Sequence, residues 1–451
     1  MRILICSENV PPQVNGIARR IGHYVDGLQK LGCTVDLLHP DCGTDKTIPF
    51  LNPWNFTARM MVLLPHHFIR LLSMPYDVVH VVLPLNLSGM WLLAGFKVTR
   101  CFSRQSKPAL VVSWHCNLWD YVEFHSTPFF KPFLRFVIFD LLFGILPSIS
   151  DRILSPTKSS DPKVIQMWSS GKKDRSGVCY TGIEKVEFSP ENKNTPEGKL
   201  WQQRKKEYLA ETKSESLVLC VSRLSLEKEI HELIKAVAAM KGCCLWLVGD
   251  GPARPELEDL ARSLKVPVKF WGYQKGDALH SVYTAADVFA LPSLTETFGQ
   301  TVNEALASQC RVALPSVPVF LEAYSDILPE DAFWEPMNRQ SMVNSIQAQL
   351  NRHKVGNPVG VPDLSKLKTW DEACQILLEE YKKAENDKLR FMKRTIVLLP
   401  FWWMTIIFTS ICILLFAKLR QAVGGSIRYF FRTITNQIKV EIKTIRNKVL
   451  S

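Results

Sequence analysis

The amino-acid sequence predicts an α/β protein with two doubly wound Rossmann-like domains that face a cleft, followed by a C-terminal membrane helix. Three observations predict this fold class. Continuous apolar runs alternate with helical patterns twice along the chain, which is typical of parallel sheets covered on both faces. A polar stretch at residues 189–216 separates the two series. Residues 395–417 form a run of 23 residues without a charge, which is long enough to span a bilayer.

The first series predicts an N-terminal domain over residues 1–188. Its expected strands are the apolar runs at residues 2–6, 34–38, 78–82, 109–114 and 151–156. A helical pattern at residues 17–31 joins the first two strands. Residues 128–147 are rich in Phe and Leu and poor in charge, which favours a core helix, and contact with lipid is the alternative.

The second series predicts a C-terminal domain over residues 217–378, after a linker at residues 189–216 that contains one polar helix. The expected strands are residues 217–221, 243–248, 268–271, 288–291 and 312–314, and the helices are residues 227–240, 255–264, 277–286 and 299–308. Because doubly wound sheets bind their ligands outside the carboxyl ends of the strands, we expect a ligand between the two domains.

The C-terminal region carries most of the positive charge. The whole chain has a net charge of +12, and residues 379–451 contain 14 basic and 5 acidic residues, a net charge of +9. A basic tail beside an apolar run indicates binding to an anionic membrane surface, whereas a basic body would indicate nucleic acid. We therefore expect no nucleic-acid partner.

Two helices are expected in this tail. The run at residues 395–417 lies between Lys393-Arg394 and Lys418, which favours a membrane helix over a buried core helix, and Pro400 leaves a bent or re-entrant insertion open. Residues 426–450 have an apolar stripe and a basic face, as in a helix that lies in a membrane interface. A coiled coil or a helix docked on the body is the alternative.

Cysteine spacing and the N-terminus bear on metal binding and cellular location. The twelve cysteines include no Cys-x-x-Cys pair, and no histidine cluster has zinc spacing, which indicates reduced thiols and no metal site. Met1 is followed at once by the first expected strand, without a signal or transit peptide. We expect a membrane protein whose body faces the cytosol, in an organelle that the sequence leaves open.

The sharpest motif is the segment 296–304, which follows the expected strand 288–291 and opens a helix. Glu296 can accept hydrogen bonds from sugar hydroxyls, and Glu304 can accept them from a ribose. Backbone N–H groups at a helix N-terminus can hold a diphosphate, and here they belong to Phe298, Gly299, Gln300 and Thr301. The alternative is a helix cap with a solvated pair of glutamates.

Basic and glycine residues follow two other expected strands of the same domain. Arg223 and Lys228 come after strand 217–221, and the sequence Gly-Asp-Gly-Pro begins at Gly249, directly after strand 243–248. Arg and Lys at the carboxyl ends of parallel strands can neutralise two phosphates. Each residue alone could be a surface charge, but their combination with the 296–304 motif indicates a site for a nucleotide sugar.

With these motifs the chain resembles glycosyltransferase family 4 over residues 1–380, and within that family it is most similar to the sulfoquinovosyltransferases. The motifs that carry the resemblance are VNGIARR at 14–20, SWHCN at 113–117, YTGIE at 180–184, LVGDGP at 247–252, PS at 292–293 and the segment 296–304. The resemblance implies the two-domain B-type glycosyltransferase fold, with the acceptor on the side of the N-terminal domain. It also implies transfer with retention and without a metal or other cofactor.

The resemblance assigns roles to individual residues. His115 is the histidine near the transferred sugar, where a histidine without this context is more often structural, and Glu296 contacts the donor sugar. The residues assigned to donor binding are Gly16, Arg223, Lys228, Gly249, Phe298, Gly299, Gln300, Thr301 and Glu304. The implied donor is a UDP-sugar, with UDP-sulfoquinovose as the first candidate, and the implied acceptor is a membrane lipid such as diacylglycerol.

Departures from the family pattern leave the donor sugar open. Gln309 replaces a glycine, the sequence SVPVF at 316–320 replaces a paired glycine, and Asn117 replaces a histidine. One alternative is a mannosyl- or glucosyltransferase that acts on another membrane lipid or on a polyprenyl-linked glycan. An alternative of another class is an inactive membrane scaffold that binds a nucleotide sugar.

Overall fold

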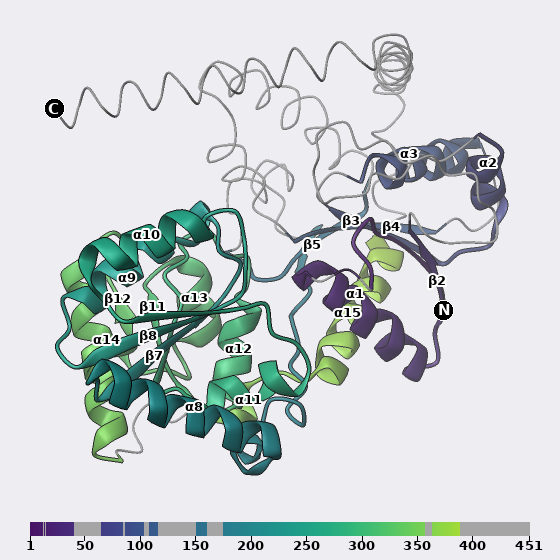
Figure 1. Cartoon of the computed structure of the whole chain (residues 1–451). Coiled ribbons are helices and arrows are strands. Elements are labelled where there is room, and N and C mark those ends of the chain that lie inside the picture. Colours follow the sequence, from purple (N-terminus) through teal and green to yellow (C-terminus); the bar gives the residue numbers. More distant parts are fainter. Residues whose placement is uncertain are drawn as a thin grey trace, which may run out of the picture. The chain divides into compact units, whose positions relative to one another are not determined.

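The computed structural model describes residues 1–11, 13, 15–39, 65–83, 86–102, 108–115, 150–159, 175–356 and 363–387. These residues form two α/β domains, each built on a parallel sheet (Figure 1). The segments expected at 128–147, 395–417 and 426–450 lie outside the described residues. Among the helices that are described, none is both long and apolar enough to cross a membrane.

The N-terminal sheet is parallel between all its described neighbours. Its strands are β1 (Arg2–Cys6), β2 (Thr34–Leu38), β3 (Val78–Leu83), β4 (Ala109–Trp114), β5 (Arg152–Ser155) and β6 (Ser176–Val178), and its helices are α1 (Gly16–Lys30), α2 (Pro65–Ser73) and α3 (Leu87–Phe102). The order β2-β1-β3-β4-β5-β6 reverses between β1 and β3. All five expected strands are confirmed, whereas β6 is three residues long and has no apolar run that reveals it.

The C-terminal sheet is also parallel between its described neighbours. Its strands are β7 (Ser216–Val221), β8 (Cys243–Val248), β9 (Val268–Gly272), β10 (Val288–Ala290), β11 (Arg311–Pro315) and β12 (Phe333–Trp334). Its helices are α9 (Ile230–Ala238), α10 (Arg254–Leu264), α11 (Asp277–Ala285), α12 (Gln300–Ala307), α13 (Pro318–Tyr324) and α14 (Arg339–Lys354). The order β12-β11-β10-β7-β8-β9 reverses between β7 and β10, and such a reversal opens a crevice at the carboxyl ends of the two strands.

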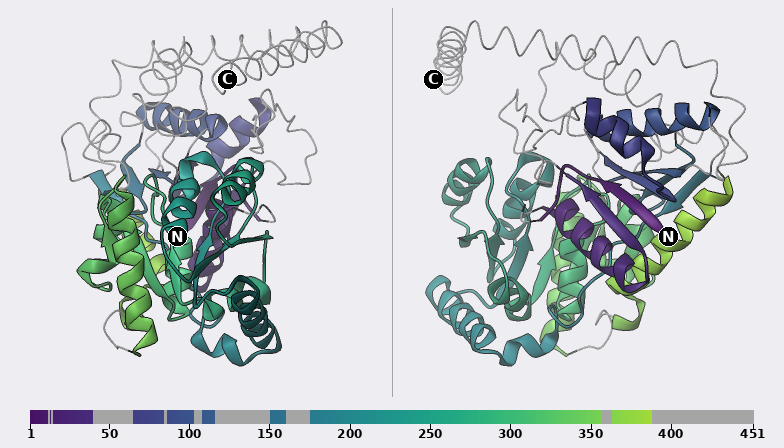
Figure 2. Two further views of the ribbon diagram at one scale, coloured as in Figure 1. Left: turned by 60° about the vertical axis from the view of Figure 1, so that its left-hand side comes forward. Right: turned by 90° about the vertical axis from the view of Figure 1, so that its right-hand side faces the viewer.

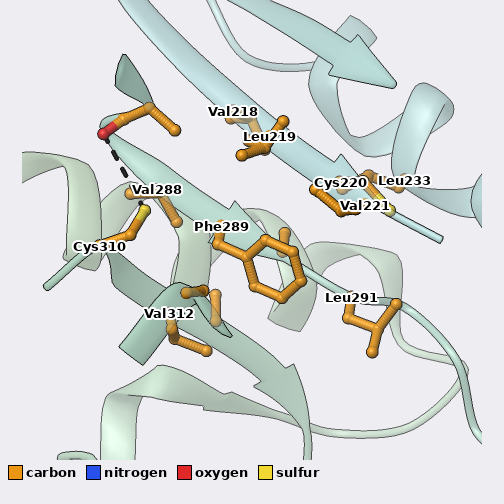
Figure 3. Packing of buried hydrophobic residues seen from close by; sticks show 14 of the residues in the cluster. Val218, Leu219, Cys220, Val221, Leu233, Val288, Phe289, Leu291, Cys310 and Val312 are labelled. Carbon is orange, nitrogen blue, oxygen red and sulfur yellow. Dashed lines mark hydrogen bonds between the residues drawn. The ribbon is translucent and has the colours of Figure 1, made fainter. Parts of the chain in front are cut away.

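Apolar side chains on both faces of the strands hold the C-terminal domain together. Every residue of β7, β8 and β10 is buried, because helices cover both faces of the sheet. Figure 3 shows Val218 and Leu219 of β7 and Phe289 of β10 in this core, with Leu233 of α9 nearby. The continuous apolar runs in the sequence are therefore explained by burial on two sides.

The stretch expected as a linker folds onto the C-terminal domain. It contains the 3-10 helix η3 (Pro190–Asn194) and the helix α8 (Pro196–Thr212), which confirms one polar helix there. Trp201 is the anchor of α8, with its ring centroid 5.5 Å from that of Trp246 and 4.9 Å from that of Trp271. The guanidinium of Arg204 lies 4.6 Å above the Trp201 ring, a cation–π contact that adds to this attachment.

The last described helix, α15 (Trp370–Asp387), packs in the core of the N-terminal domain. Leu377 and Tyr381 are fully buried there with Ile21 and Tyr24 of α1. Figures 1 and 2 show α15 beside α1. The boundary expected at residue 378 falls within this helix, because an apolar helical face in the sequence does not identify the sheet that it covers.

Substitution of Leu377 tests this packing. Leu377→Ala leaves a cavity between α15 and the N-terminal sheet, and we expect the free energy of unfolding to fall by about 2 to 5 kcal/mol. Urea unfolding of the whole chain measures the change. Gln375→Ala, at an exposed position of the same helix, is the control and should change it by less than about 0.5 kcal/mol. Equal effects of the two substitutions would contradict the packing of α15.

Candidate functional site

The strand order brings Lys228 and Glu296 together. Lys228 ends the 3-10 helix η4 (Leu226–Lys228) that follows β7, and Glu296 lies in the loop that follows β10. Because β7 and β10 are neighbours at the reversal point, their carboxyl ends lie side by side. Lys228 Nζ is 2.5 Å from Glu296 Oε1, and both side chains are less than one fifth exposed. Two residues assigned to the site from sequence are therefore in direct contact.

The start of α12 has the backbone needed for a close approach to an anion. Gly299 is the N-cap, with a φ of 88° that favours glycine, and an added Cβ would lie 2.8 Å from the Phe320 ring. A glycine has no side chain to cap the helix, so the N–H groups of Gln300 and Thr301 are available to a bound group. Phe298 is buried beneath this turn.

Glu304 lies inside the site rather than on a solvated helix face. Its side chain is only 5% exposed, and its two oxygens accept hydrogen bonds from Arg19 and Tyr283, each at 2.6 Å. Burial raises the pKa of this carboxyl, although Arg19 and Tyr283 act in the opposite direction. These two bonds use about half of the four lone-pair sites of a carboxylate, which leaves acceptor capacity for further hydroxyl groups.

His115 directly follows β4 and is 6% exposed. Arg20 contacts its Nδ1, and Ser113 Oγ lies 2.8 Å from its Nε2. Burial, together with the charge of Arg20, holds the pKa of His115 well below its usual range, so the ring is neutral. Both ring nitrogens are therefore engaged by the protein, and the ring is held in a fixed orientation.

Four hydrogen bonds between described residues link the N-terminal domain to the segment 296–304. Thr297 Oγ1 donates to the backbone oxygen of His115 at 3.2 Å. Gln300 Nε2 donates to the backbone oxygen of Gly16 at 3.1 Å. The third is the bond from Arg19 to Glu304, and the fourth runs from Thr157 Oγ1 to the backbone oxygen of Thr297 at 3.4 Å. The structure thus brings Gly16 and His115 to the segment that contains the predicted donor-binding motif.

The remaining two predicted residues have other surroundings. Arg223 has a side chain that is 55% exposed and contacts Glu227, four residues further along the chain, rather than Glu296. Gly249 has a φ of 128°, and a Cβ at this position would overlap the carbonyl oxygen of Ser222. The requirement for glycine at residue 249 is thus explained by packing of backbone against backbone.

Several side chains that contact the site were not assigned roles from the sequence. Arg19 and Arg20 lie in the VNGIARR motif, which was a usable signal, but nothing local indicates that their partners are Glu304 and His115. Tyr283 lies in α11, and its hydroxyl donates a hydrogen bond to Glu304 of the neighbouring helix α12. Long-range pairing of this kind has no sequence pattern.

A metal site was not expected, and within the described ranges no group of three or more His, Cys, Asp or Glu side chains is placed to hold a metal ion. Lys228 is a cationic side chain near the position predicted for the diphosphate.

Known proteins are similar to this chain in sequence and in fold. Residues 202–351 match the family model described as glycosyl transferases group 1. HepE from Anabaena, solved in complex with UDP and glucose, has the same fold, with a TM-score of 0.54 and 16% identity over 86% of this chain and 98% of that one.

Two relatives are similar in sequence. The α-monoglucosyldiacylglycerol synthase of Acholeplasma laidlawii is 24% identical over 425 residues, which cover 86% of this chain and 99% of the relative. The sulfoquinovosyl transferase SQD2 of Arabidopsis thaliana is 28% identical over 177 residues. That match covers 37% of this chain and about a third, 34%, of the length of SQD2. The expected resemblance to sulfoquinovosyltransferases is thus confirmed as sequence similarity.

The backbone role of Gly249 gives a stability prediction. We expect Gly249→Ala to lower the free energy of unfolding by at least about 2 kcal/mol more than Gly242→Ala. Both glycines have positive φ and flank β8, but a Cβ at Gly242 meets only ordinary contacts, from 3.6 Å. Urea unfolding of the two variants measures the difference. Equal losses would show that residue 249 has no steric requirement.

Burial of His80 gives a pH prediction. His80 lies in β3, is fully buried, and burial lowers its pKa from 6.5 to about 3. Because the unfolded chain binds the proton first as the pH falls, stability is complete above pH 6.5 and is lost progressively below it, until about pH 3. We expect the protonation of His80 in the unfolded chain to lower the free energy of unfolding by about 2 kcal/mol between pH 6.5 and pH 5.

Urea unfolding of wild type and His80→Leu at these two pH values measures this contribution. As the pH falls, the free energy of unfolding should decrease by about 2 kcal/mol less in the variant than in wild type. An identical pH dependence of the two proteins would show that His80 has the same pKa in the folded and unfolded chains.

Proposed function

We propose that the chain is a retaining, metal-independent glycosyltransferase of family 4 that transfers a sugar from a UDP-sugar to a membrane lipid. The first candidates are UDP-sulfoquinovose as donor and diacylglycerol as acceptor. The observation that carries the proposal is the contact of Lys228 with Glu296 at the β7/β10 reversal point, next to the glycine N-cap of α12. The basic side chain and the helix N-terminus can bind a diphosphate, and the acidic side chain beside them can bind the sugar that is attached to it.

In this proposal the two domains have different tasks. Lys228, Arg223 and the first N–H groups of α12 bind the diphosphate, and Glu296 orients the donor sugar. Glu304, which keeps acceptor capacity beside Arg19 and Tyr283, binds the ribose. His115 lies near the transferred sugar.

The proposed reaction needs no protein base. The bond between the anomeric carbon and the diphosphate oxygen breaks through an oxocarbenium-like state, and the acceptor oxygen forms the new bond on the same face. The departing diphosphate takes the proton of the acceptor hydroxyl, while Lys228 and the α12 N-terminus stabilise its charge. This route agrees with the state of His115, whose two ring nitrogens are already engaged.

The lipid acceptor is supported by the relatives and by the tail. The Acholeplasma relative that aligns over 86% of this chain is named an α-monoglucosyldiacylglycerol synthase. The uncharged run at 395–417 and the basic pattern at 426–450 favour attachment to an anionic membrane, with the catalytic body on the cytosolic side. Attachment raises the effective concentration of a lipid acceptor at the site.

A donor screen tests the proposal. Purified, detergent-solubilised protein is incubated with diacylglycerol and one of UDP-sulfoquinovose, UDP-glucose, UDP-galactose or GDP-mannose. Transfer from UDP-sulfoquinovose alone supports the sulfolipid assignment. Transfer from UDP-glucose or GDP-mannose supports the glucosyl- or mannosyltransferase alternative, and transfer from UDP-galactose moves the function to a neighbouring branch of the family. Donor binding without transfer or hydrolysis supports the inactive scaffold.

Removal of the central cation should stop the reaction without unfolding the protein. We expect Lys228→Ala to lower kcat/KM for transfer at least about 100-fold, because the departing diphosphate loses a charge-assisted partner. The control is Lys354→Ala, which removes a more exposed lysine–glutamate pair. Its partner is Glu215, at 2.9 Å, next to the opposite end of β7. An unchanged rate in Lys228→Ala, with thermal stability intact, would remove Lys228 from the site.

The tail gives a separate prediction. We expect a chain without residues 395–451 to remain in the supernatant when it is centrifuged with anionic lipid vesicles, whereas the full chain sediments. If the truncated chain still sediments, the N-terminal domain is the main membrane contact.

A further inference from the structure

A chain of buried polar side chains connects α15 to His115 through the core of the N-terminal domain. Tyr381 Oη lies 2.7 Å from His80 Nδ1. His80 Nε2 lies 2.7 Å from Ser113 Oγ, which in turn lies 2.8 Å from His115 Nε2. Tyr381, His80 and Ser113 are fully buried, and His115 is nearly so.

The parallel register explains why these groups meet. Ser113 of β4 pairs with Val82 of β3, and His80 lies two residues before Val82, so both side chains are on one face of the sheet. Val78, Val82 and Val111 on this face pack against α1 and α15. The polar chain thus crosses an apolar core, where an unpaired polar group is costly.

Arg20 determines the direction in which the hydrogen bonds between these buried side chains run. A guanidinium can only donate, so the contact of Arg20 with His115 Nδ1 makes that nitrogen an acceptor. A neutral His115 then carries its proton on Nε2 and donates to Ser113 Oγ. The Ser113 hydroxyl, having accepted one bond, donates to His80 Nε2, and His80 Nδ1–H donates to Tyr381 Oη.

Both rings are neutral in this arrangement. Burial lowers the pKa of His80 to about 3, and burial with the charge of Arg20 holds the pKa of His115 well below its usual range. A neutral imidazole has one donor and one acceptor, and each ring uses both. The ring protons of the two histidines and the hydroxyl proton of Ser113 therefore each have one position.

We propose that Ser113, His80 and Tyr381 are positioning residues that hold His115 as the Nε2–H tautomer in one ring orientation. The proposal rests on the proposed function for the assignment of His115 to the transferred sugar. As a consequence, α15 completes the site without contacting substrate. Its Tyr381 is 301 residues from His80 in sequence. The orientation of a group beside the reacting sugar affects the transition state more than donor binding.

The test compares two tyrosines in the same core. Tyr381→Phe removes the acceptor at the end of the chain. Tyr24→Phe is the matched control, because Tyr24 is equally buried in this core and its hydroxyl donates to backbone oxygens of Cys179 and Tyr180 instead. The full chain is labelled with 15N-histidine, and the signals of His80 and His115 are assigned by their loss in His80→Gln and His115→Gln.

In wild type we expect a protonated Nε2 at His115 and a protonated Nδ1 at His80. Tyr381→Phe should shift the ring signals of both histidines and lower kcat roughly 10- to 100-fold, with KM for the donor within about 2-fold. Tyr24→Phe should leave the histidine signals and kcat unchanged. Ser113→Ala, which breaks the chain at its centre, should reproduce the Tyr381→Phe result, and this variant serves if Tyr381→Phe does not fold.

Two results would overturn the proposal. One is a wild-type His115 that carries its proton on Nδ1 or on both nitrogens. The other is a pair of variants, Tyr381→Phe and Ser113→Ala, whose His115 signals and kcat match those of Tyr24→Phe. If wild type transfers no sugar from any donor, the proposed function fails, whereas the ring signals still decide whether the chain positions His115.

Discussion

The contact between Lys228 and Glu296 depends on one constraint, the reversal of strand order between β7 and β10. The two strands are far apart in sequence, and their parallel pairing places both following loops at one edge of the sheet. The glycine N-cap of α12 lies a few residues beyond Glu296, so a cation, a carboxylate and the N-terminus of a helix converge there. The proposed donor site is a consequence of this topology.

The N-terminal domain contributes to the same site through long-range pairs. Arg19 and Arg20 are adjacent in α1, yet Arg19 pairs with Glu304 and Arg20 with His115. One turn of α1 thus contacts both Glu304, which is proposed to bind the ribose, and His115, which is proposed to lie near the transferred sugar. On its other side His115 is joined through the buried chain to Tyr381 of α15, so packing in the core and geometry of the site are coupled.

The sequence predicts the parts of this structure that have a local cause. Buried strands appear as continuous apolar runs, and Lys228, Glu296 and Glu304 follow such runs at recognisable spacings. It does not predict that α15 belongs to the N-terminal core, because the apolar face of a helix does not specify its partner. Nor does it predict that Tyr283 reaches Glu304 or that His80 lies within hydrogen-bond distance of Ser113, since each depends on tertiary placement.

The central claim is that Glu304 and the neighbouring loops bind a nucleotide sugar, and nucleotide binding tests it most directly. Calorimetric titration of the purified chain compares UDP with its 2′,3′-dideoxy analogue, in wild type and in Glu304→Gln. If Glu304 accepts the ribose hydroxyls, the analogue should bind wild type at least about 10-fold more weakly than UDP, and this difference should shrink in the variant. Equal binding of the two nucleotides to wild type, or no saturable binding of either, would contradict the claim.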